Sequence, residues 1–337
     1  MMLVNMMKIV VLGSNSFSGS HLVDYLLENT SAEIIGISRS PENDPVFLPY
    51  LYQKTRSQRF RFFQFDINKD RKAILELFDS EKPEIIVNYA AQGEVRTSWK
   101  YPEQWFQTNT MAFVGLLTEL KDRKYIRKYI QASTPEVYGS CDGRVKENFN
   151  YLPSTPYAVS KAACDMYLVA LAKSFNFPVV MTRAANVYGI HQQLYRIIPR
   201  TIIYLKLGKT IELHGGGNMK RGFIHIRDDC DAVLKIINSE RPSLVYHLSP
   251  DDGLRTIRDI VKYICHKTGH DFSRSTRDVD APVGQDTVYD LDSSLAKREL
   301  GWSPKVSFEA GVDETIRWID DNWDVIKDKP FEYIHKE

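Results

Sequence analysis

The stretch KIVVLGSNSFSGS, residues 8–20, joins an apolar run to a glycine turn and then to a helical pattern. The run over 8–13 is almost continuously apolar, which is typical of a strand that helices cover on both faces. Gly13 and Gly19 flank the turn, and Ser16 stands where a third glycine of a G-x-x-G-x-x-G pattern would stand. Glycines at such a turn let backbone N–H groups approach a pyrophosphate at a helix N-terminus. The stretch therefore indicates a dinucleotide site, although a glycine turn that binds nothing would have the same sequence.

The alternation of apolar runs and helical patterns continues through the first half of the chain. Further strands are expected at 32–38, 61–66, 84–90, 128–133 and 178–184, and helices at 18–28, 69–80, 103–121 and 157–175. This alternation predicts an α/β fold with a doubly wound parallel sheet of the Rossmann type. Ligands of such folds bind at the carboxyl ends of the strands.

The regular alternation ends near residue 190. Shorter helices are expected after it, at 197–207, 228–238, 256–268 and 308–322. No Pro/Gly/Ser-rich linker separates the two parts, so we expect their pieces to be interleaved. We therefore predict a dinucleotide-binding Rossmann domain over 1–190 and a smaller substrate lobe over 191–337.

The overall composition is that of an ordinary globular protein. Of the 337 residues, 43% are hydrophobic and 26% are charged, which allows one large core or two unequal domains. The 44 basic and 43 acidic side chains give a net charge of +1, which provides no general attraction for nucleic acid or an anionic membrane. The apolar N-terminus runs straight into the first strand, and no apolar run reaches the roughly 18 to 20 residues that cross a bilayer. We expect a cytoplasmic protein whose partner is a small molecule.

The cysteines indicate neither disulfides nor a metal site. They stand far apart, with no C-x-x-C pair and no histidine at the spacing of metal ligands. They are Cys141, Cys164, Cys230 and Cys265. We interpret them as reduced thiols and expect no metal.

The end of the second expected strand bears on the choice of cofactor. NAD sites commonly place an acidic residue there for the ribose 2′-OH, whereas this chain has Ser38 and Arg39. A guanidinium can bind a 2′-phosphate through two hydrogen bonds, which favours NADP. If Arg39 is only a surface charge, the cofactor is NAD. Asp66, which closes the third strand, is a candidate for the adenine edge or for a helix cap.

The glycine turn and the ends of the third and fourth strands supply the remaining cofactor candidates. They are Ser14, Asn15, Ser16, Phe17, Ile67, Ala90 and Ala91. We expect Ser14 and Asn15 to offer short polar side chains to the same ribose phosphate as Arg39.

The sequence YAVSK places Tyr157 and Lys161 four residues apart, on one face of a helix. An ammonium near a phenol favours the phenolate, so we expect Lys161 to lower the pKa of Tyr157. Such a tyrosine can exchange a proton with a sugar hydroxyl during hydride transfer. The pair alone is common at helix surfaces. Its position after a strand that ends in Ser-Thr, on a sheet with a dinucleotide turn, favours a catalytic role.

Several motifs are spread over nearly the whole chain. They are GSNSFSG, YAAQGEV, TNT at 108–110, STPEVYG, TPYAVSK, TRAANVYG, RIIP, KRGFIHIRD and RELGW. Together they resemble the extended branch of the short-chain dehydrogenase/reductase superfamily, and within it the nucleotide-sugar 4,6-dehydratases. The resemblance implies an NAD(P)-dependent enzyme that oxidises C4 of a nucleotide-diphosphate hexose, removes water across C5 and C6, and returns the hydride to C6.

The resemblance also assigns roles to individual residues. Thr134, Tyr157 and Lys161 correspond to the hydride-transfer group. Glu136 corresponds to the base that removes the C5 proton, rather than to a solvated loop charge. Pro135 departs from the dTDP-glucose 4,6-dehydratases, which look like STDEVYG and protonate the departing C6 hydroxyl with that aspartate. GDP-mannose 4,6-dehydratases resemble STSELYG, lack that acid and use NADP, and this chain fits their one-carboxylate arrangement.

Substrate anchoring is implied by the same resemblance. Asn186 matches the asparagine that holds the sugar diphosphate, and Arg221 matches the arginine that clamps it. Arg196 is either a further contact or a helix-surface charge. The segment GQDTV, 284–288, has threonine and valine where dTDP-glucose dehydratases carry basic residues. The nucleotide base therefore remains open.

Other activities also remain open. UDP-glucuronate decarboxylases look like STSEVYG and would also carry Glu136, whereas 4-epimerases usually have small residues there. A cofactor-sensing binding protein without turnover is a further alternative. Some relatives of this kind have lost the tyrosine or the lysine that matches Tyr157 or Lys161, whereas this chain has both.

The resemblance further implies a homodimer that forms a four-helix bundle. The helices expected at 103–121 and 157–175 carry apolar stripes that suit this role. The stripes include Phe106, Phe113 and Leu117 on one helix and Met166, Leu168 and Leu171 on the other.

Overall fold

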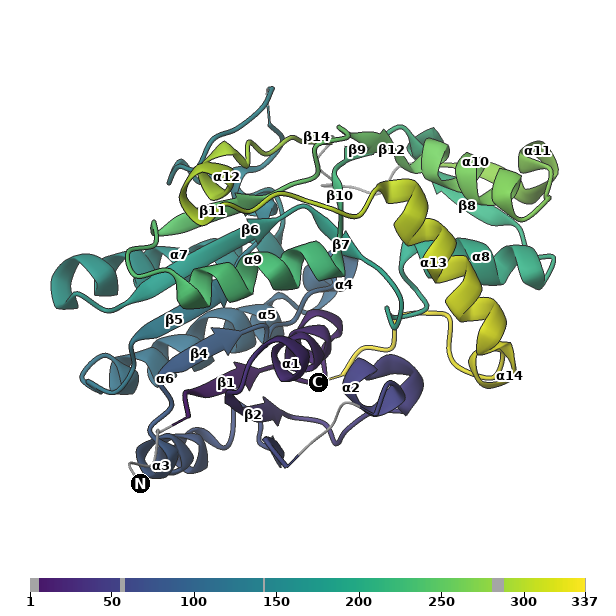
Figure 1. The fold of residues 1–337 in the computed structure, drawn as a ribbon. Helices are drawn as coiled ribbons and strands as arrows, with labels where there is room; N and C mark the ends of the chain where they lie inside the picture. Colours follow the sequence, from purple (N-terminus) through teal and green to yellow (C-terminus); the bar gives the residue numbers. More distant parts are fainter. Residues whose placement is uncertain (1–5, 55–57, 142, 281–287, 337) are drawn as a thin grey trace.

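The fold is built around a seven-stranded sheet in which all neighbouring strands are parallel (Figure 1). The computed structural model describes residues 6–54, 58–141, 143–280 and 288–336. The strand order is β11-β6-β5-β4-β1-β2-β3, so the sheet winds outward from β1 in both directions. The predicted doubly wound α/β fold is therefore confirmed. The strands are β1 (Lys8–Leu12), β2 (Glu33–Ser38), β3 (Phe60–Gln64), β4 (Ile85–Asn88), β5 (Lys128–Ala132), β6 (Val179–Ala184) and β11 (Val245–Leu248).

Strand β11 is the one strand of this sheet that the apolar pattern does not predict. Its four residues, VYHL, are all buried, and Val245 pairs with Met181 of β6. A run of four residues is too short to separate from a buried loop by periodicity. Because β11 comes from the second half of the chain and completes the sheet of the first, the two halves are interleaved. The boundary at residue 190 stays a prediction.

Helices cover both faces of the sheet, which explains why its strands are apolar on both sides. One face carries α1 (Phe17–Asn29), α9 (Ile226–Asn238) and α12 (Ser294–Leu300), and the other carries α3 (Arg71–Glu81), α6 (Ala112–Leu120) and α7 (Pro156–Phe175). Side chains alternate between these layers along each strand. Ile9 and Val11 belong to the core under α1 and α9. Val10 and Leu12 belong to the core on the opposite face.

A smaller lobe surrounds a third apolar core that includes Ile202, Ile264 and Ile319. Figure 1 shows this lobe on the side toward which the strands of the large sheet run. Its main helices are α8 (Ile197–Lys206), α10 (Ile257–Lys267) and α13 (Phe308–Asp321). Its small sheets pair β7 (Asn186–Tyr188) with β10 (Phe223–His225), β8 (Ile211–His214) with β13 (Thr276–Val279), and β9 (Lys220–Arg221) with β12 (Arg255–Thr256) and β14 (Val288–Tyr289).

Short helices form many of the connections. They are α2 (Pro49–Tyr52), α4 (Val95–Lys100), α5 (Pro102–Phe106), α11 (Phe272–Ser275) and α14 (Trp323–Ile326), with 3₁₀ turns at Pro45–Phe47, Pro135–Tyr138 and Gly215–Gly217. The helix expected at 103–121 is present as one continuous run over 102–120, in which a π-helical turn over Gln107–Met111 joins α5 to α6. No helix among the described residues is long and apolar enough to cross a membrane.

The two ends of the described chain differ in their surroundings. Residues 1–5, which belong to the apolar N-terminus, lie outside the described residues, and β1 begins at Lys8. After α14 the chain turns back toward the large sheet (Figure 1), where His335 contacts α5 and Lys336 contacts Arg39 after β2. The last described residues thus return from the small lobe to the sheet.

Candidate active site

The glycine turn between β1 and α1 is a tight backbone crossing. Gly13 has a φ of +80°, and a Cβ there would lie 2.7 Å from the backbone nitrogen of Ala90. A Cβ on Gly19 would lie 2.2 Å from the carbonyl oxygen of Gly13, so this glycine lets α1 approach the turn. Ser16 caps α1 by accepting a hydrogen bond from the Gly19 N–H at 3.1 Å. The positive end of the helix dipole therefore faces the site where a dinucleotide diphosphate binds in such folds.

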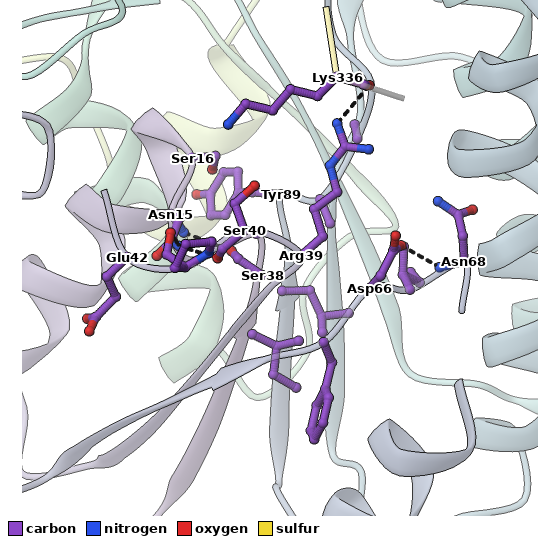
Figure 2. A pocket seen from close by; sticks show the side chains of 18 of the residues that line it. Asn15, Ser16, Ser38, Arg39, Ser40, Glu42, Asp66, Asn68, Tyr89 and Lys336 are labelled. Carbon is purple, nitrogen blue, oxygen red and sulfur yellow. Dashed lines mark hydrogen bonds between the residues drawn. The ribbon is translucent and has the colours of Figure 1, made fainter. Parts of the chain in front are cut away.

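A pocket of about 410 Å³ extends from this turn along the carboxyl ends of β2 and β3 (Figure 2). Its elongated lining, glycine turn and polar rim fit the adenosine and diphosphate of a dinucleotide. The predicted cofactor residues that line it are Gly13, Asn15, Ser16, Ser38, Arg39, Asp66, Ile67, Ala90 and Ala91.

Hydrogen bonds fix the polar rim of this pocket. The Ser38 hydroxyl accepts from the Asn15 N–H at 2.9 Å, which ties the end of β2 to the glycine turn. The Asn15 side-chain amide donates to the carbonyl of Ser40 at 2.9 Å. Arg39 donates through Nη2 to the carbonyl of Lys336 at 3.0 Å. The predicted cofactor-selecting arginine is thus in contact with the C-terminal end of the described chain.

Two predicted cofactor residues are turned away from the pocket. The Ser14 side chain is fully buried, and its hydroxyl lies against β2, where a Cβ on Gly36 would approach it to 2.7 Å. The expectation that Ser14 offers its hydroxyl to a phosphate is therefore wrong for this structure. Phe17 is buried in the core under α1, with its ring edge-on to His21 at 5.0 Å.

Asp66 lies at the pocket wall after β3 and shapes a turn. Its carboxylate accepts from the Asn68 N–H at 2.8 Å. The N-cap position of α3 is Asp70, so Asp66 is not the helix cap that the sequence left open. Its place in the pocket lining agrees with a contact to the adenine end of a cofactor.

The loop over 133–138 carries the candidate catalytic residues at the end of β5. Thr134 is buried and caps the 3₁₀ turn, since its Oγ1 accepts from the Glu136 N–H at 3.2 Å. Thr134 also hydrogen-bonds Tyr157, which stands at the start of α7. The charges of Glu136 and Arg196 lie close enough to Tyr157 to act on its pKa. The fold therefore brings a hydroxyl, a carboxylate and a phenol together.

Lys161 does not act on Tyr157 in the way the sequence led us to expect. Burial raises the pKa of Tyr157, the negative charge of Glu136 raises it further, and the hydrogen bond from Thr134 opposes the rise. The Lys161 ammonium is buried and donates to the carbonyl of Ala132 in β5 at 2.7 Å. Burial also lowers the pKa of Lys161. The expected lowering of the Tyr157 pKa is thus wrong here, because burial outweighs any attraction from an ammonium directed at the strand.

A buried ion pair supports the 133–138 loop from behind. Arg183 and Asp165 are fully buried, with 3.1 Å between Nη2 and Oδ2. Asp165 also accepts from the Ser133 hydroxyl at 2.5 Å. The Arg183 guanidinium lies over the rings of Tyr138 and Tyr151, 4.7 and 5.1 Å from their centroids, and donates to both hydroxyls. Because a buried charge left without its partner is costly, this network holds the loop in one position.

Asn109, the central residue of the TNT motif, lies in the π-helical turn and joins two parts of the site. Its side chain accepts from the Gln92 N–H at 2.8 Å and donates to the Gln92 carbonyl at 3.0 Å. It also lies 3.0 Å from the hydroxyl of Ser160, the residue before Lys161. Such π-turns often occur at functional sites. The motif signalled Asn109, but its bridging role needed the structure.

Two of the predicted substrate residues are neighbours in the small lobe. Asn186 begins β7, and its N–H donates to the carbonyl of Gly222 at 3.0 Å, directly after Arg221. Arg221 is buried, and its guanidinium lies 4.5 Å from the ring centroid of Tyr289. Of the segment GQDTV, only Val288 lies within the described residues.

Arg196 lies close enough to Tyr157 for its positive charge to lower the pKa of the phenol. It begins α8, its side chain is exposed, and its guanidinium lies 5.2 Å from the ring centroid of Tyr195. Both alternatives from the sequence, a substrate contact and a helix-surface charge, are compatible with this position.

Among the pocket-lining residues that sequence reasoning missed, Tyr89 and Lys336 make contacts that shape the site. Tyr89 belongs to the YAAQGEV motif, and its hydroxyl lies 3.4 Å from a carboxylate oxygen of Asp229. Lys336 belongs to no motif, and its contact with Arg39 spans 297 positions of the chain. Within the described ranges, no three His, Cys, Asp or Glu side chains are placed to hold a metal ion.

Comparison with known families shows where the chain belongs. The family model described as GDP-mannose 4,6 dehydratase matches residues 10–315. The chain belongs to this family. A dTDP-glucose 4,6-dehydratase of Escherichia coli is 29% identical over 345 residues, which cover 94% of each chain. A probable dTDP-glucose 4,6-dehydratase of Sinorhizobium fredii is 30% identical and covers 96% of this chain and 97% of the relative.

Solved structures of related enzymes that contain NAD have the same fold as this chain. The dTDP-glucose 4,6-dehydratase DesIV of Streptomyces venezuelae, with NAD bound, superimposes with a TM-score of 0.86 at 30% identity, covering 94% of this chain and 98% of that one. A UDP-glucuronic acid 4-epimerase of Bacillus cereus, in complex with UDP-glucuronic acid and NAD, has a TM-score of 0.84 at 27% identity over 94% and 99% of the two chains. The predicted membership of the extended short-chain dehydrogenases and the predicted activity class, a nucleotide-sugar 4,6-dehydratase, are therefore confirmed.

Proposed function

We propose that this protein converts a nucleotide-diphosphate hexose into its 4-keto-6-deoxy derivative, with Glu136 as the base of the elimination. The observation that carries this proposal is the position of Glu136 beside Thr134 and Tyr157 at the end of β5. An epimerase needs groups for hydride transfer, whereas a dehydratase also needs a group that removes the C5 proton. A half-buried carboxylate at this position meets that additional need.

Tyr157 and Thr134 act on the C4 hydroxyl. Tyr157 accepts the hydroxyl proton as the C4 hydride departs, and Thr134 holds the phenol in place through its hydrogen bond. When bound, the oxidised nicotinamide cofactor accepts the hydride from C4 and returns it to C6 after water has left. Tyr157 can accept this proton only as the phenolate; burial and the charge of Glu136 raise its pKa and oppose that form, and the positive charge of the oxidised nicotinamide would favour it.

Glu136 acts on C5 and C6. A ketone at C4 acidifies the C5 proton, which Glu136 removes. The neighbouring position is Pro135, whose side chain cannot donate a proton, so the protonated Glu136 supplies the proton to the C6 oxygen as the C6–O bond breaks. After water has left and C6 has received the hydride, C5 regains a proton from solvent by way of Glu136, and Tyr157 releases to solvent the proton that it took from the C4 hydroxyl. One carboxyl group therefore serves both halves of the elimination.

The substrate side is proposed from three residues of the small lobe. Asn186 and Arg221 lie together and would hold the diphosphate, and Arg196 lies close enough to Tyr157 to offer a further contact. The partner is therefore proposed to be a nucleotide-diphosphate sugar, with the base left open. Location in the cytoplasm stays a prediction from the sequence.

For the cofactor, we propose NAD, which the solved dehydratase relatives contain. A preference for NADP has its support in Arg39, whose guanidinium lies at the pocket rim after β2. Measuring the affinities of the cofactor-free protein for NAD and NADP by calorimetry distinguishes these two choices.

We also propose a homodimer through the helices at 102–120 and 156–175. These helices have apolar residues on a buried face and on an exposed face. The buried face includes Phe113, Leu117, Leu168 and Leu171. Met111 and Met166 are 58% and 57% exposed although both are large and apolar. An exposed apolar face of this kind is typical of a subunit interface.

The test is a panel of nucleotide hexoses followed by mass spectrometry. A dehydratase gives a product lighter by one water, a decarboxylase gives a product lighter by carbon dioxide, and an epimerase leaves the mass unchanged. Binding of NAD(H) without turnover of any sugar would indicate the cofactor-sensing alternative. Loss of water from at least one hexose is the expected result.

A further inference from the structure

The last described residues cross from the small lobe to the cofactor pocket. Residues 329–336, here called the C-terminal strap, follow α14 and end against α5 and the rim of the cofactor pocket. At its start, Lys329 pairs with Asp44 at 2.7 Å. Further along, Glu332 accepts from the Tyr204 hydroxyl of α8 at 2.6 Å. The strap is thus attached to both lobes.

Aromatic contacts hold the middle of the strap over the site. The ring of Tyr333 lies edge-on to Tyr195 at 5.3 Å. Burial raises the pKa of Tyr333, and the nearby charges of Arg39 and Arg196 oppose that rise, so Tyr333 lies between the cofactor rim and the substrate side.

His335 fixes the end of the strap to the first domain. Its ring stacks on Tyr101 at 4.8 Å and 4°, and on Trp105 at 5.4 Å and 13°. Its Nε2 also lies 2.6 Å from the amide oxygen of Gln104. Stacking on two rings with a directed hydrogen bond leaves little rotational freedom, which sets the position of the next residue.

Lys336 is held by its backbone and has its side chain in the pocket lining. Its carbonyl accepts from Arg39 Nη2 at 3.0 Å and from Gln92 Nε2 at 3.0 Å. Figure 2 shows its side chain extending across the pocket, above Ser16 and Tyr89. The backbone of Lys336 is fixed by these two donors, so its ammonium is directed over the pocket.

We propose that the C-terminal strap is part of the cofactor site and that the Lys336 ammonium binds the diphosphate of the dinucleotide. The glycine turn offers N–H groups and a helix dipole to this diphosphate from one side, with Ser16 at the helix start. A cation that closes the opposite side adds a charge-assisted contact. This inference rests on the proposed function only in that the ligand is a nicotinamide dinucleotide.

The strap also gives the cofactor a barrier to release. A dehydratase must keep the reduced cofactor in place between the removal of the hydride and its return to C6. Lys336 would have to move before a dinucleotide beneath it could leave, and the contacts of His335 with Tyr101 and Trp105 hold Lys336 in place. The strap therefore predicts slow dissociation of the cofactor as well as tighter binding.

Calorimetry on the cofactor-free full chain tests the role of the charge. Lys336→Met should weaken NAD and ADP by about 3- to 10-fold, because it removes one exposed charge-assisted contact, and should leave adenosine binding unchanged. The affinity for ADP should also become less sensitive to salt. Lys336→Arg should restore both the affinity and its sensitivity to salt. Lys327→Met, an equal change at an exposed lysine outside the pocket lining, is the matched control.

Two results would overturn this assignment. Equal ADP affinity in Lys336→Met and the wild type would remove Lys336 from the site. An equal loss of affinity for adenosine and ADP would show that the Lys336 side chain contributes packing and not a contact between its charge and the diphosphate. If the wild type binds NAD but dehydrates no sugar, the proposed function fails and this inference is still tested by the same titrations.

Stopped-flow release of NADH tests the strap itself. His335→Ala should speed dissociation by about 10-fold, because it removes the stacking that positions Lys336. Ile334→Ala, at the exposed neighbouring position, is the control and should not change the rate. An unchanged rate in His335→Ala would contradict a closing role for the strap.

Discussion

The hydroxyl of Tyr89, in the wall of the cofactor pocket, lies 3.4 Å from a carboxylate oxygen of the buried Asp229. Burial raises the pKa of Asp229 from 3.8 to about 7, the hydrogen bond from Tyr89 opposes that rise, and the charge of Asp228 adds to it. In the folded protein the carboxyl group therefore retains its proton at a pH where the unfolded chain has lost it.

This pKa predicts how stability depends on pH. Between about pH 4 and pH 7 the folded state binds more protons at Asp229 than the unfolded state does, so stability falls as the pH rises through this window. Asp229→Asn keeps the shape of the side chain and stays neutral. In this variant the free energy of unfolding should therefore decrease less with rising pH, by on the order of a few kcal/mol. Urea unfolding at pH 5 and pH 8 measures this change in the free energy of unfolding. The exposed Asp328→Asn is the control, and parallel curves for Asp229→Asn and the wild type would contradict the prediction.

Glu136→Gln should separate oxidation from elimination. The amide keeps the reach of the side chain but cannot accept the C5 proton, so water loss should fall by on the order of 10² to 10⁴ while C4 oxidation persists. Slow reduction of the bound cofactor, followed by absorbance, reports the first step, and mass spectrometry reports the second. Glu240→Gln, at an exposed site, should behave as the wild type. Undiminished water loss in Glu136→Gln would remove Glu136 as the base.

Tyr157→Phe should instead stop the first step. Without the phenol no group takes the C4 hydroxyl proton, so reduction of the bound cofactor by substrate should slow by on the order of 10² to 10⁴. Tyr167→Phe, on the same helix and paired with Thr118, is the matched control. If the two variants reduce the cofactor equally fast, Tyr157 is not the proton acceptor.

Met166→Glu should dissociate the proposed dimer. A carboxylate at the centre of an apolar contact would be buried without a partner, which association cannot tolerate. Light scattering at micromolar concentration should give the dimer mass for the wild type and the monomer mass for the variant. Val325→Glu places the same charge at an exposed apolar residue on α14 and should remain dimeric. A monomeric wild type would contradict the proposal.

Arg39→Asp should shift the cofactor preference toward NAD. Replacing a guanidinium by a carboxylate at the end of β2 repels a 2′-phosphate and favours a 2′-hydroxyl, so the NADP-to-NAD affinity ratio should fall by about 10- to 100-fold. Titration of both cofactors into the cofactor-free protein measures the ratio. Arg298→Asp, which lies outside the pocket lining, is the control. A constant ratio would show that Arg39 does not face the ribose.

Most of the sheet was predictable because its signals are local. The apolar runs placed six strands to within one or two residues at either end, and the glycine turn indicated where α1 begins. The pair Tyr157 and Lys161 could be placed on one helix by spacing alone. These features depend on residues that are neighbours in the chain.

The features that were missed depend on distant residues. The contact of Lys336 with Arg39 has no sequence signature, because it arises from the path of the chain after α14. The sign of the Tyr157 pKa shift depends on burial and on Glu136, neither of which helix spacing can report. Ser14 looked available in the turn, but the fold directs its hydroxyl under β2.

The edge strand β11 sets an order in which the protein can fold. It pairs with β6, yet α8, the small strands β7 to β10 and α9 all lie between the two in the chain. Until that whole segment has been synthesised and folded, β6 presents unpaired backbone groups and the apolar residues Val179, Val180 and Met181 at an open edge. Such an edge invites pairing between nascent chains. A fragment that stops at residue 190 should therefore aggregate rather than bind a dinucleotide on its own.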